Sequence, residues 1–418
     1  MEQERVPWQR NLWLVWIALF VVNVGFSLIM PFLPLYIQSM GLTGPHVELW
    51  TGLIFSANFI TAAFFLPYWG GVADRFGRRL MMIRAGVGMS IVISLMGFTH
   101  APWQMLVLRL LQGTTVGFLP ASIAYMTSIV PKDRTGYTLG ILQTAITGGT
   151  ILGPFVGGVL ATAMGYRPIF FLNGFACLLA AAIAFVFLKE DVKPVARQEK
   201  KRPMSEDFRM VAANPTLLAM MVVVMVQQFS VMNAEPIIPL FLQTLAAPAS
   251  VLSFLSGTIF SVVGVADVLA SPFLGRRGDR YGYKKVLMIC LGGVAISYFL
   301  QGLSITWWHL LITRFLQGCF VGGIMASANS LISLTADAKD QGRTFGVSSS
   351  FQQVGNFLGP LAGSAIAAGY SYRAVFPFTA VLILANLVWV WRLVPERRGV
   401  DEVQPNPAAM DPEPGLSD

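Results

Sequence analysis

Long apolar stretches alternate with short polar connections along this chain of 418 residues. Each stretch holds about 20 mostly apolar residues, the length that crosses the hydrocarbon core of a bilayer as a helix. Helices are expected because an open strand edge would leave backbone groups unpaired in lipid. The pattern predicts twelve spans, at residues 12–37, 49–69, 80–99, 103–129, 136–163, 168–188, 215–243, 251–273, 286–303, 307–333, 343–369 and 373–393.

The two halves of the chain resemble each other. The connection after the second span reads GGVADRFGRR at residues 70–79, and the connection after the eighth reads GRRGDRYGYKK at residues 275–285. Further positions match at an offset of 205 or 206, and they include Arg109 with Arg314, Pro31 and Pro34 with Pro236 and Pro239, and Gly153-Pro154 with Gly359-Pro360. Because each half has six spans, the sequence predicts parallel repeats related by an axis along the membrane normal.

These observations predict an all-α membrane protein of twelve transmembrane helices in two six-helix bundles. Residues 1–190 form the first bundle and residues 214–395 the second. Residues 191–213 form a cytoplasmic linker, which we expect to be a solvated connector whose basic residues rest on anionic lipid headgroups. Residues 396–418, rich in Pro, Asp and Glu, form a tail that we expect to be disordered.

Composition and charge support a membrane protein. Only 12% of the residues are charged, against about 25% in soluble proteins. All but four of the 29 Lys and Arg residues lie at the termini or in the even-numbered connections, and this bias places both termini in the cytoplasm. The same bias explains the net charge of +8 without a nucleic-acid partner. The three cysteines fall within apolar runs, as buried free thiols do.

With these motifs in hand, the sequence resembles the major facilitator superfamily, and within it the twelve-helix drug–proton antiporter family of bacteria. The resemblance covers residues 10–395. It rests on the 70–79 loop, on a helix-four motif at Arg109–Gly117, on a helix-one motif at Gly25–Pro34, and on a helix-five antiporter motif at Gly140–Gly158. Helix eleven carries a near copy of that last motif at Gly346–Gly363.

The duplicated basic loops are candidates for a cytoplasmic gate. Their glycines permit a tight turn, and an Asp can accept hydrogen bonds at a nearby helix start. The resemblance implies that Asp74 and Arg75 hold the halves together while the site faces outward. A turn that only sets topology is the alternative. The candidate gating residues are Asp74, Arg75, Arg78, Asp279 and Arg280.

Two carboxylates lie well inside predicted spans, Glu235 and Asp267, and their repeat equivalents are Met30 and Ala62. Burial favours the neutral form of a carboxylic acid, so either is a candidate proton carrier near neutral pH. A buried acid paired with a donor on a neighbouring helix is the alternative. Arg109 is expected to face the interior, and the resemblance implies a part in proton coupling. A purely structural arginine is the alternative for Arg109 and for its mate Arg314.

Prolines and glycines within spans predict helix bends or close helix packing. The candidate bends are Pro31, Pro34, Gly153, Pro154, Pro236, Pro239, Gly359 and Pro360. Polar and adaptable side chains on helices one, two, five, seven and eleven are candidates for a largely apolar substrate cavity. They are Asn23, Phe26, Asn58, Gln143, Gln227, Met232, Asn233, Gln353 and Asn356.

No enzyme signature, cofactor motif or metal site is found in the sequence, and the chain lacks a Gly-Lys-Ser/Thr phosphate loop. An ion gradient is therefore the expected driving force. We expect a monomeric multidrug efflux antiporter of the bacterial inner membrane that exchanges lipophilic or cationic compounds for protons and contacts membrane lipids. A lipid or amphipathic-metabolite exporter or flippase of the same fold is the alternative, and a non-transporting receptor or scaffold is a third class.

Overall fold

The computed structural model of the protein describes residues 8–190, 204–337 and 339–395, apart from the side chains of Asp74, Met204 and Ser205. These ranges contain helices and loops and no strand. The predicted disordered tail and most of the predicted linker lie outside them. The first half contains α1 (Trp8–Leu28), α2 (Leu33–Gln38), α3 (Pro45–Phe76), α4 (Arg78–Met96), α5 (Pro102–Thr114), α6 (Phe118–Ile129), η1 (Lys132–Arg134), α7 (Thr135–Met164) and α8 (Tyr166–Phe187).

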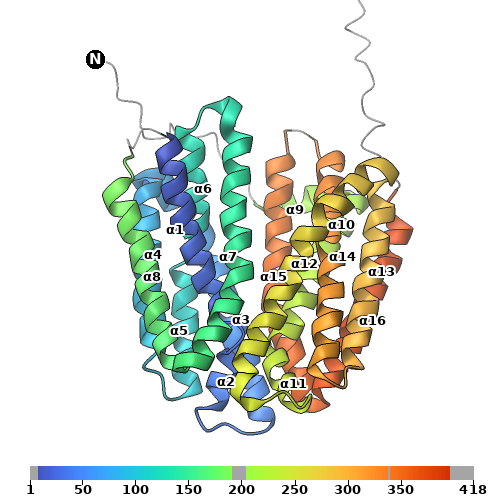
Figure 1. Cartoon of the computed structure of the whole chain (residues 1–418). Coiled ribbons are helices and arrows are strands. Elements are labelled where there is room, and N and C mark those ends of the chain that lie inside the picture. Colours follow the sequence, from blue (N-terminus) through green and yellow to red (C-terminus); the bar gives the residue numbers. More distant parts are fainter. Residues whose placement is uncertain (1–7, 191–203, 338, 396–418) are drawn as a thin grey trace, which may run out of the picture.

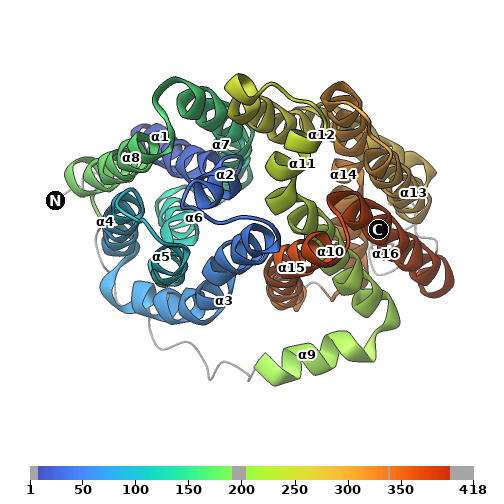
Figure 2. The same ribbon diagram turned by 90° about the horizontal axis from the view of Figure 1, so that it is seen from below.

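The second half repeats this order. It contains α9 (Met204–Ala213), α10 (Pro215–Ala234), η2 (Glu235–Ile237), α11 (Ile238–Thr244), η3 (Ala249–Val251), α12 (Leu252–Tyr281), α13 (Tyr283–Gly302), α14 (Trp307–Thr335), α15 (Gln341–Gly369) and α16 (Tyr372–Leu393). Figures 1 and 2 show the halves side by side. We call the side where α1 begins and α16 ends, at the top of Figure 1, the basic side, and the other the opposite side.

Among the described residues, eleven helical segments are long and apolar enough to cross a membrane. The twelfth, α15, has 29 residues and contains many serines, glutamines and glycines, so it is not among these eleven. The predicted all-α architecture is confirmed.

Three predicted spans are not continuous α-helices, and their prediction was wrong in this respect. The seventh passes through the 3-10 helix η2 between α10 and α11. The first span stops at Leu28 and resumes at Leu33, around Pro31, because proline cannot donate a backbone hydrogen bond. The fourth span stops at Thr114 and resumes at Phe118, where Gly117 has a φ of +121°. That left-handed conformation is accessible to glycine and costly for other residues.

Residues of α3 and α4 stabilise the break in the fourth span. The indole of Trp69 donates to the carbonyl oxygen of Thr114 at 2.8 Å, and the Arg84 guanidinium donates to that of Val116 at 2.5 Å. Arg84 also lies over the Trp69 ring, 3.6 Å from its centroid. These contacts pair two carbonyl groups at the break, which would otherwise be costly to bury.

The second half has no such break at the equivalent place. There α14 continues through Gly322, and Leu274 and Ile289 occupy the positions equivalent to Trp69 and Arg84. Both are apolar and suit a helix whose carbonyl groups are paired internally. Trp69 and Arg84 are therefore specific to the broken helix of the first half.

Glycines determine how α7 and α15 pack inside their halves. A Cβ atom on Gly153 would lie 2.6 Å from the backbone oxygen of Val24 in α1, and one on Gly359 would lie 2.8 Å from that of Phe229 in α10. Pro154 and Pro360 follow these glycines within continuous helices. The antiporter-like motif and its copy thus bring equivalent helices together in the two halves, as small residues do in lipid.

The same Gly-Pro helices contact the other half of the molecule. A Cβ atom on Gly257 of α12 would lie 2.2 Å from the backbone oxygen of Pro154, and one on Gly52 of α3 would lie 2.7 Å from that of Pro360. Gly52 and Gly257 are equivalent positions of the repeat. Two symmetry-related backbone contacts, α7 with α12 and α15 with α3, therefore join the halves.

Four hydrogen bonds join the halves in the described part of the chain. Two are near mid-span, from Ser56 to the Phe357 oxygen at 2.7 Å and from Ser261 to the Ile151 oxygen at 2.6 Å. Two are at the opposite side, where Gln243 bonds Gln38 at 2.8 Å and the Tyr372 hydroxyl bonds Glu48. All four bonds lie near mid-span or at the opposite side, whereas nearer the basic side cavities of about 480 and 500 Å³ lie along α7/α12 and α3/α15. The described halves are thus joined at the opposite side and separate towards the basic side.

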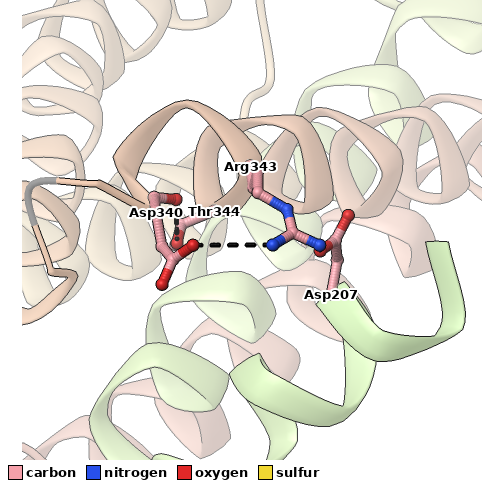
Figure 3. Close-up of polar contacts among 4 residues, drawn as sticks. All are labelled: Asp207, Asp340, Arg343 and Thr344. Carbon is pink, nitrogen blue, oxygen red and sulfur yellow. Dashed lines mark hydrogen bonds and ion pairs between the residues drawn. The ribbon is translucent and has the colours of Figure 1, made fainter. Parts of the chain in front are cut away.

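The helix α9 shows that the predicted linker at 191–213 is structured in part. Asp207 of α9 pairs with Arg343 of α15, which also lies 3.5 Å from Asp340 (Figure 3). Val211 is buried, and the rings of Phe208 and Phe351 have centroids 6.1 Å apart. The end of the linker is thus attached to the second half. Its basic cluster, Lys193 to Arg202, lies outside the described residues.

We expect Arg84→Met to destabilise the protein by about 1–3 kcal/mol, because it leaves the Val116 carbonyl oxygen unpaired. Thermal unfolding of the purified protein in detergent measures the effect. Ile289→Met, at the equivalent position of the second half, is the matched control and should leave the melting temperature unchanged. Equal stability of the Arg84 variant and the wild type would show that the break does not depend on this bond.

Gly257→Ala should shift the molecule towards states that are open at the opposite side, because the added methyl group overlaps the Pro154 oxygen. Spin labels at His46 and Ser250, both exposed at that side, report the distance between the halves. Gly275→Ala on the same helix is the control, since no atom lies within 4 Å of its Cβ position. Identical distance distributions for the two variants would contradict a role for this contact in closure.

Candidate functional site

A buried network of polar side chains occupies the second half, between α10, α13 and α14. The Tyr298 hydroxyl donates to the Ser230 backbone oxygen at 2.7 Å and accepts from Gln317 at 2.9 Å. Gln317 in turn accepts from Gln301 at 2.9 Å. These groups lie in the interior of a membrane-spanning bundle, where each unmade hydrogen bond is costly.

Arg314 lies close to this network, but the network does not pair all of its hydrogen-bond donors. Its side chain is 3% exposed, and its Nε and Nη2 atoms have no hydrogen-bond partner among the described residues. The guanidinium interacts electrostatically with the Tyr298 phenol and with the Glu235 carboxylate. A buried cation with free donors attracts an anion or water, so this arginine favours a negative charge in its neighbourhood.

Glu235 supplies a negative charge that interacts with Arg314. It lies in η2, between α10 and α11, and is partly buried. Within the described ranges its carboxylate has no hydrogen-bond partner, and its charge is balanced only through the interaction with Arg314. The η2 segment contacts α2 and α3 of the first half as well as α15. Glu235 therefore lies where the two halves meet.

The first half has the arginine but not the network. Arg109 is 2% exposed and donates from Nη1 to Gln112 at 3.1 Å, while its Nε and Nη2 atoms have no partner in the described chain. The positions equivalent to Tyr298, Gln301 and Glu235 are the apolar residues Ile93, Met96 and Met30. The structure thus brings Arg314, and not Arg109, together with a predicted coupling carboxylate.

Asp267 lies apart from Glu235. It is on α12, where its Oδ1 atom accepts from the Ser271 hydroxyl at 2.7 Å and lies against Gly322 of α14. The residue lines the cavity between α7 and α12, together with the predicted cavity residue Gln143. The two intramembrane acids therefore occupy different environments, one at a buried arginine and the other at a cavity wall.

Three predicted cavity residues are buried between helices. Asn58, Gln227 and Asn233 are 4%, 2% and 0% exposed. Asn233 donates to the Thr379 hydroxyl at 2.6 Å, joining α10 to α16. The side-chain oxygens of all three lack partners among the described residues. Asn233 thus helps to hold α10 and α16 together, and the free oxygens leave all three amides able to accept a further hydrogen bond.

Another predicted pair lies at the edge of a cavity. Gln228 donates to Asn356 at 3.2 Å, and Asn356 donates to Gln353 at 2.8 Å. Gln353 lines the cavity between α3 and α15. This chain of amides connects α10 with the wall of that cavity.

The remaining predicted cavity residues have packing contacts. Asn23 donates to the Leu19 backbone oxygen at 2.8 Å and lies against Gly149, and Met232 lies against Gly359. Phe26 is partly buried beside the first core. None of these three lines the cavities along α7/α12 and α3/α15.

The predicted gate residues contact only their own halves in the described structure. Arg78 donates from Nη1 to the Ala124 oxygen at 2.9 Å, and Arg75 is exposed. The Asp279 carboxylate accepts from Tyr283, and the Arg280 guanidinium lies 5.5 Å from the Tyr281 ring. The side chain of Asp74 lies outside the described residues. A gate across the halves stays a prediction. In this structure, which is open on the basic side, the described gate side chains contact only their own halves.

The structure also reveals polar residues that the sequence did not single out. Glu48, at the edge of a predicted span, is 6% exposed and accepts from Tyr372 across the halves, which closes the opposite side. Glu190 accepts from the backbone N–H groups of Arg78 and Arg79, at 2.9 and 2.7 Å, and so caps α4. An acid next to an apolar run was the available signal in both cases, but its partner is distant in sequence.

The molecule has two parallel six-helix halves with intramembrane charges and with cavities between the halves. This architecture is typical of membrane transporters built from structural repeats. The sequence profile of the Major Facilitator Superfamily matches residues 15–255 and 220–413. The chain therefore belongs to the major facilitator superfamily. Among the described residues, no group of three or more His, Cys, Asp or Glu side chains could hold a metal ion.

Known proteins resemble the chain over nearly its full length. It is 38% identical over 397 residues to the Multidrug resistance protein MdtG of Salmonella typhimurium, covering 94% of this chain and 97% of that protein. MdtG of Escherichia fergusonii is equally similar. Among solved structures, the nucleoside transporter NupG has a TM-score of 0.80 at 12% identity, over 92% of this chain and all of that one.

A D-xylose-proton symporter has a TM-score of 0.73 at 16% identity, over 92% of this chain and 97% of that one. A bacterial homologue of the lysosomal transporter Spinster, solved inward-facing and unoccupied, has a TM-score of 0.76 at 14% identity, over 92% and 96% of the two chains. At such identities these structures show a shared fold.

Proposed function

We propose that the protein exports lipophilic, often cationic compounds across the bacterial inner membrane in exchange for protons, by alternating access. The observation that carries the proposal is the Glu235 carboxylate, which has no hydrogen-bond partner in the described chain, interacts electrostatically with the buried Arg314, and lies on a segment that contacts both halves. The similarity to proteins named for multidrug resistance supports the export of varied compounds. In this scheme the substrate crosses the membrane without chemical change.

The state described here opens to the basic side, which the charge bias assigns to the cytoplasm. A substrate would enter from that side while Glu235 is ionised. Closing the basic side and parting the contacts at the opposite side would expose the acid to protons from outside. Protonation would remove the charge that attracts a cation, and it would also leave Arg314 without its counter-charge. Substrate and proton thus compete for one carboxylate.

That competition is sufficient for coupling. A ligand shifts a conformational equilibrium only by its difference in affinity for the two states, and each tenfold ratio corresponds to about 1.4 kcal/mol. Because η2 contacts both halves, a change of charge at Glu235 acts on the interface that must rearrange. Buried charges of this kind are costly in a membrane unless they are used.

Export or flipping of a lipid or amphipathic metabolite is the second candidate. It is favoured by the cavity of about 500 Å³ along α3 and α15, whose described lining contains apolar residues, serines and Gln353 but no charged side chain. Dye-efflux and lipid-translocation assays in the same proteoliposomes distinguish the two functions. A receptor or scaffold would show neither activity.

Glu235→Gln mimics the protonated acid permanently, so we expect it to fold normally but to lose proton-driven efflux, by more than about tenfold. Binding of tetraphenylphosphonium, a lipophilic cation, should release protons from the wild type and not from the variant. Glu206→Gln, which removes an exposed acid on α9, is the matched control. If the Glu235 variant pumps the cation against its gradient with normal proton release, coupling lies elsewhere.

The assigned orientation predicts which loops are accessible from outside the cell. A cysteine at Ser250, in η3, should react with an impermeant maleimide added to intact cells, whereas a cysteine at Arg276 should react only after permeabilisation. Both positions are exposed. Reaction of the Arg276 cysteine in intact cells would reverse the orientation and contradict cytoplasmic termini.

A further inference from the structure

The cavity between α7 and α12 differs in chemistry from the one between α3 and α15. It has a volume of about 480 Å³, and its walls come from both halves of the protein. Asp267 and Ser271 lie on the α12 wall, and Gln143 and Thr147 on the α7 wall. Ile151 lines it as well, and the Ile151 backbone oxygen accepts the mid-span bond from Ser261. The cavity therefore begins where the contact between the halves ends.

Asp267 supplies a negative charge that no basic side chain neutralises within the described residues. Its Oδ1 atom accepts from Ser271 at 2.7 Å, and the residue as a whole is partly exposed. None of the residues lining the cavity is Lys, Arg or His. A carboxylate that is held in place by one hydroxyl, with its other oxygen free of a described partner, suits a cationic group.

Two aromatic residues of α1 pack against the α7 wall of the same cavity without lining it. Thr144, a lining residue, accepts from the Trp16 indole at 2.9 Å. The Trp16 and Phe20 rings are stacked, with centroids 5.3 Å apart, and the Phe20 ring lies 3.5 Å from the Cβ position of the lining residue Gly148. The stacked rings therefore hold the α7 wall in place through Thr144 and Gly148.

The cavity between α3 and α15 provides an internal comparison. It is similar in size, about 500 Å³, yet it has no charged side chain among its described lining residues. The repeat equivalent of Asp267 is Ala62, so the acid belongs to one cavity only. Similar geometry with different charge isolates the contribution of the carboxylate.

We propose that the cavity between α7 and α12 is a binding site for organic cations that combine a charged centre with apolar groups, and that Asp267 is the residue that selects their charge. This proposal rests on the proposed export function, and the site would be the place where a substrate first binds on the basic side. Since its walls belong to different halves, the cation must leave the cavity before the halves close there. Asp267 would thus select the substrate, while Glu235 couples it to protons.

The test compares two valines that line the two cavities. Val268 and Val354 are 46% and 44% exposed, so cysteines placed there should react with a maleimide at similar rates. The labelling is done in lipid nanodiscs at one pH, without a gradient, after the three native cysteines have been replaced. Tetraphenylphosphonium should slow the labelling of the cysteine at 268 and leave that at 354 unchanged. The neutral triphenylphosphine oxide should protect neither selectively.

Asp267→Asn should raise the cation concentration needed for protection about two- to fivefold, as expected for the loss of one partly exposed ion pair. Asp267→Glu, which keeps the charge, should retain protection, and it guards against a misfolded Asn variant. Asp133→Asn removes an acid that is 75% exposed in η1 and should change nothing. Unchanged protection in Asp267→Asn, or equal protection of both cysteines in the wild type, would overturn the proposal.

Failure of this site and failure of the proposed coupling give different results. Protection is an equilibrium measurement without a proton gradient, so Glu235→Gln should retain protection at position 268. If that variant also pumps normally while Asp267→Asn loses protection, the coupling role of Glu235 is wrong and the cation site stands. If Glu235→Gln abolishes pumping and Asp267→Asn protects as the wild type does, the cation site is wrong and the coupling role stands.

Discussion

The backbone contact between each Gly-Pro helix and a glycine of the other half is the constraint on which the described state depends. The Pro154 oxygen fits against Gly257 and the Pro360 oxygen against Gly52, where any side chain would overlap the carbonyl group. In the same state Ser261 bonds the Ile151 oxygen and Tyr372 bonds Glu48. The cavities towards the basic side exist because the helices diverge from these contacts.

The contact is approximately twofold symmetric, but the chemistry around it is not. The second half contains Glu235, Arg314 and the Tyr298 network, whereas the first half has Arg109 with apolar residues at the equivalent places. Similarly, Asp267 places a negative charge in one of the two cavities. A duplicated scaffold thus supplies two equivalent joints, and single substitutions in one copy supply the charges. The scaffold can rock symmetrically while ions and substrates act on one half.

Much of the fold could be predicted from the sequence, because a bilayer limits the possible structures. Apolar length predicts the spans, and the repeat at an offset of about 205 predicts two matching bundles. The breaks at residues 29–32 and 115–117 were not predicted as interruptions, although Pro31 lies in one and Gly117 in the other. A proline or glycine can also remain inside a helix, as Pro154 does, and the outcome depends on partners such as Trp69 and Arg84.

The sequence by itself determined the helical class, the two-half repeat, the bias of basic residues, and the identity of two unusual intramembrane acids. Each of these follows from composition and periodicity along the chain, which local physics and the bilayer suffice to interpret. Only the tertiary structure decided that Glu235 interacts electrostatically with Arg314 and not with Arg109, that Asp267 lines a separate cavity, and that Glu48 bonds Tyr372 at the opposite side. These relations join residues up to 324 positions apart, and helix rotation and packing set them, not sequence spacing.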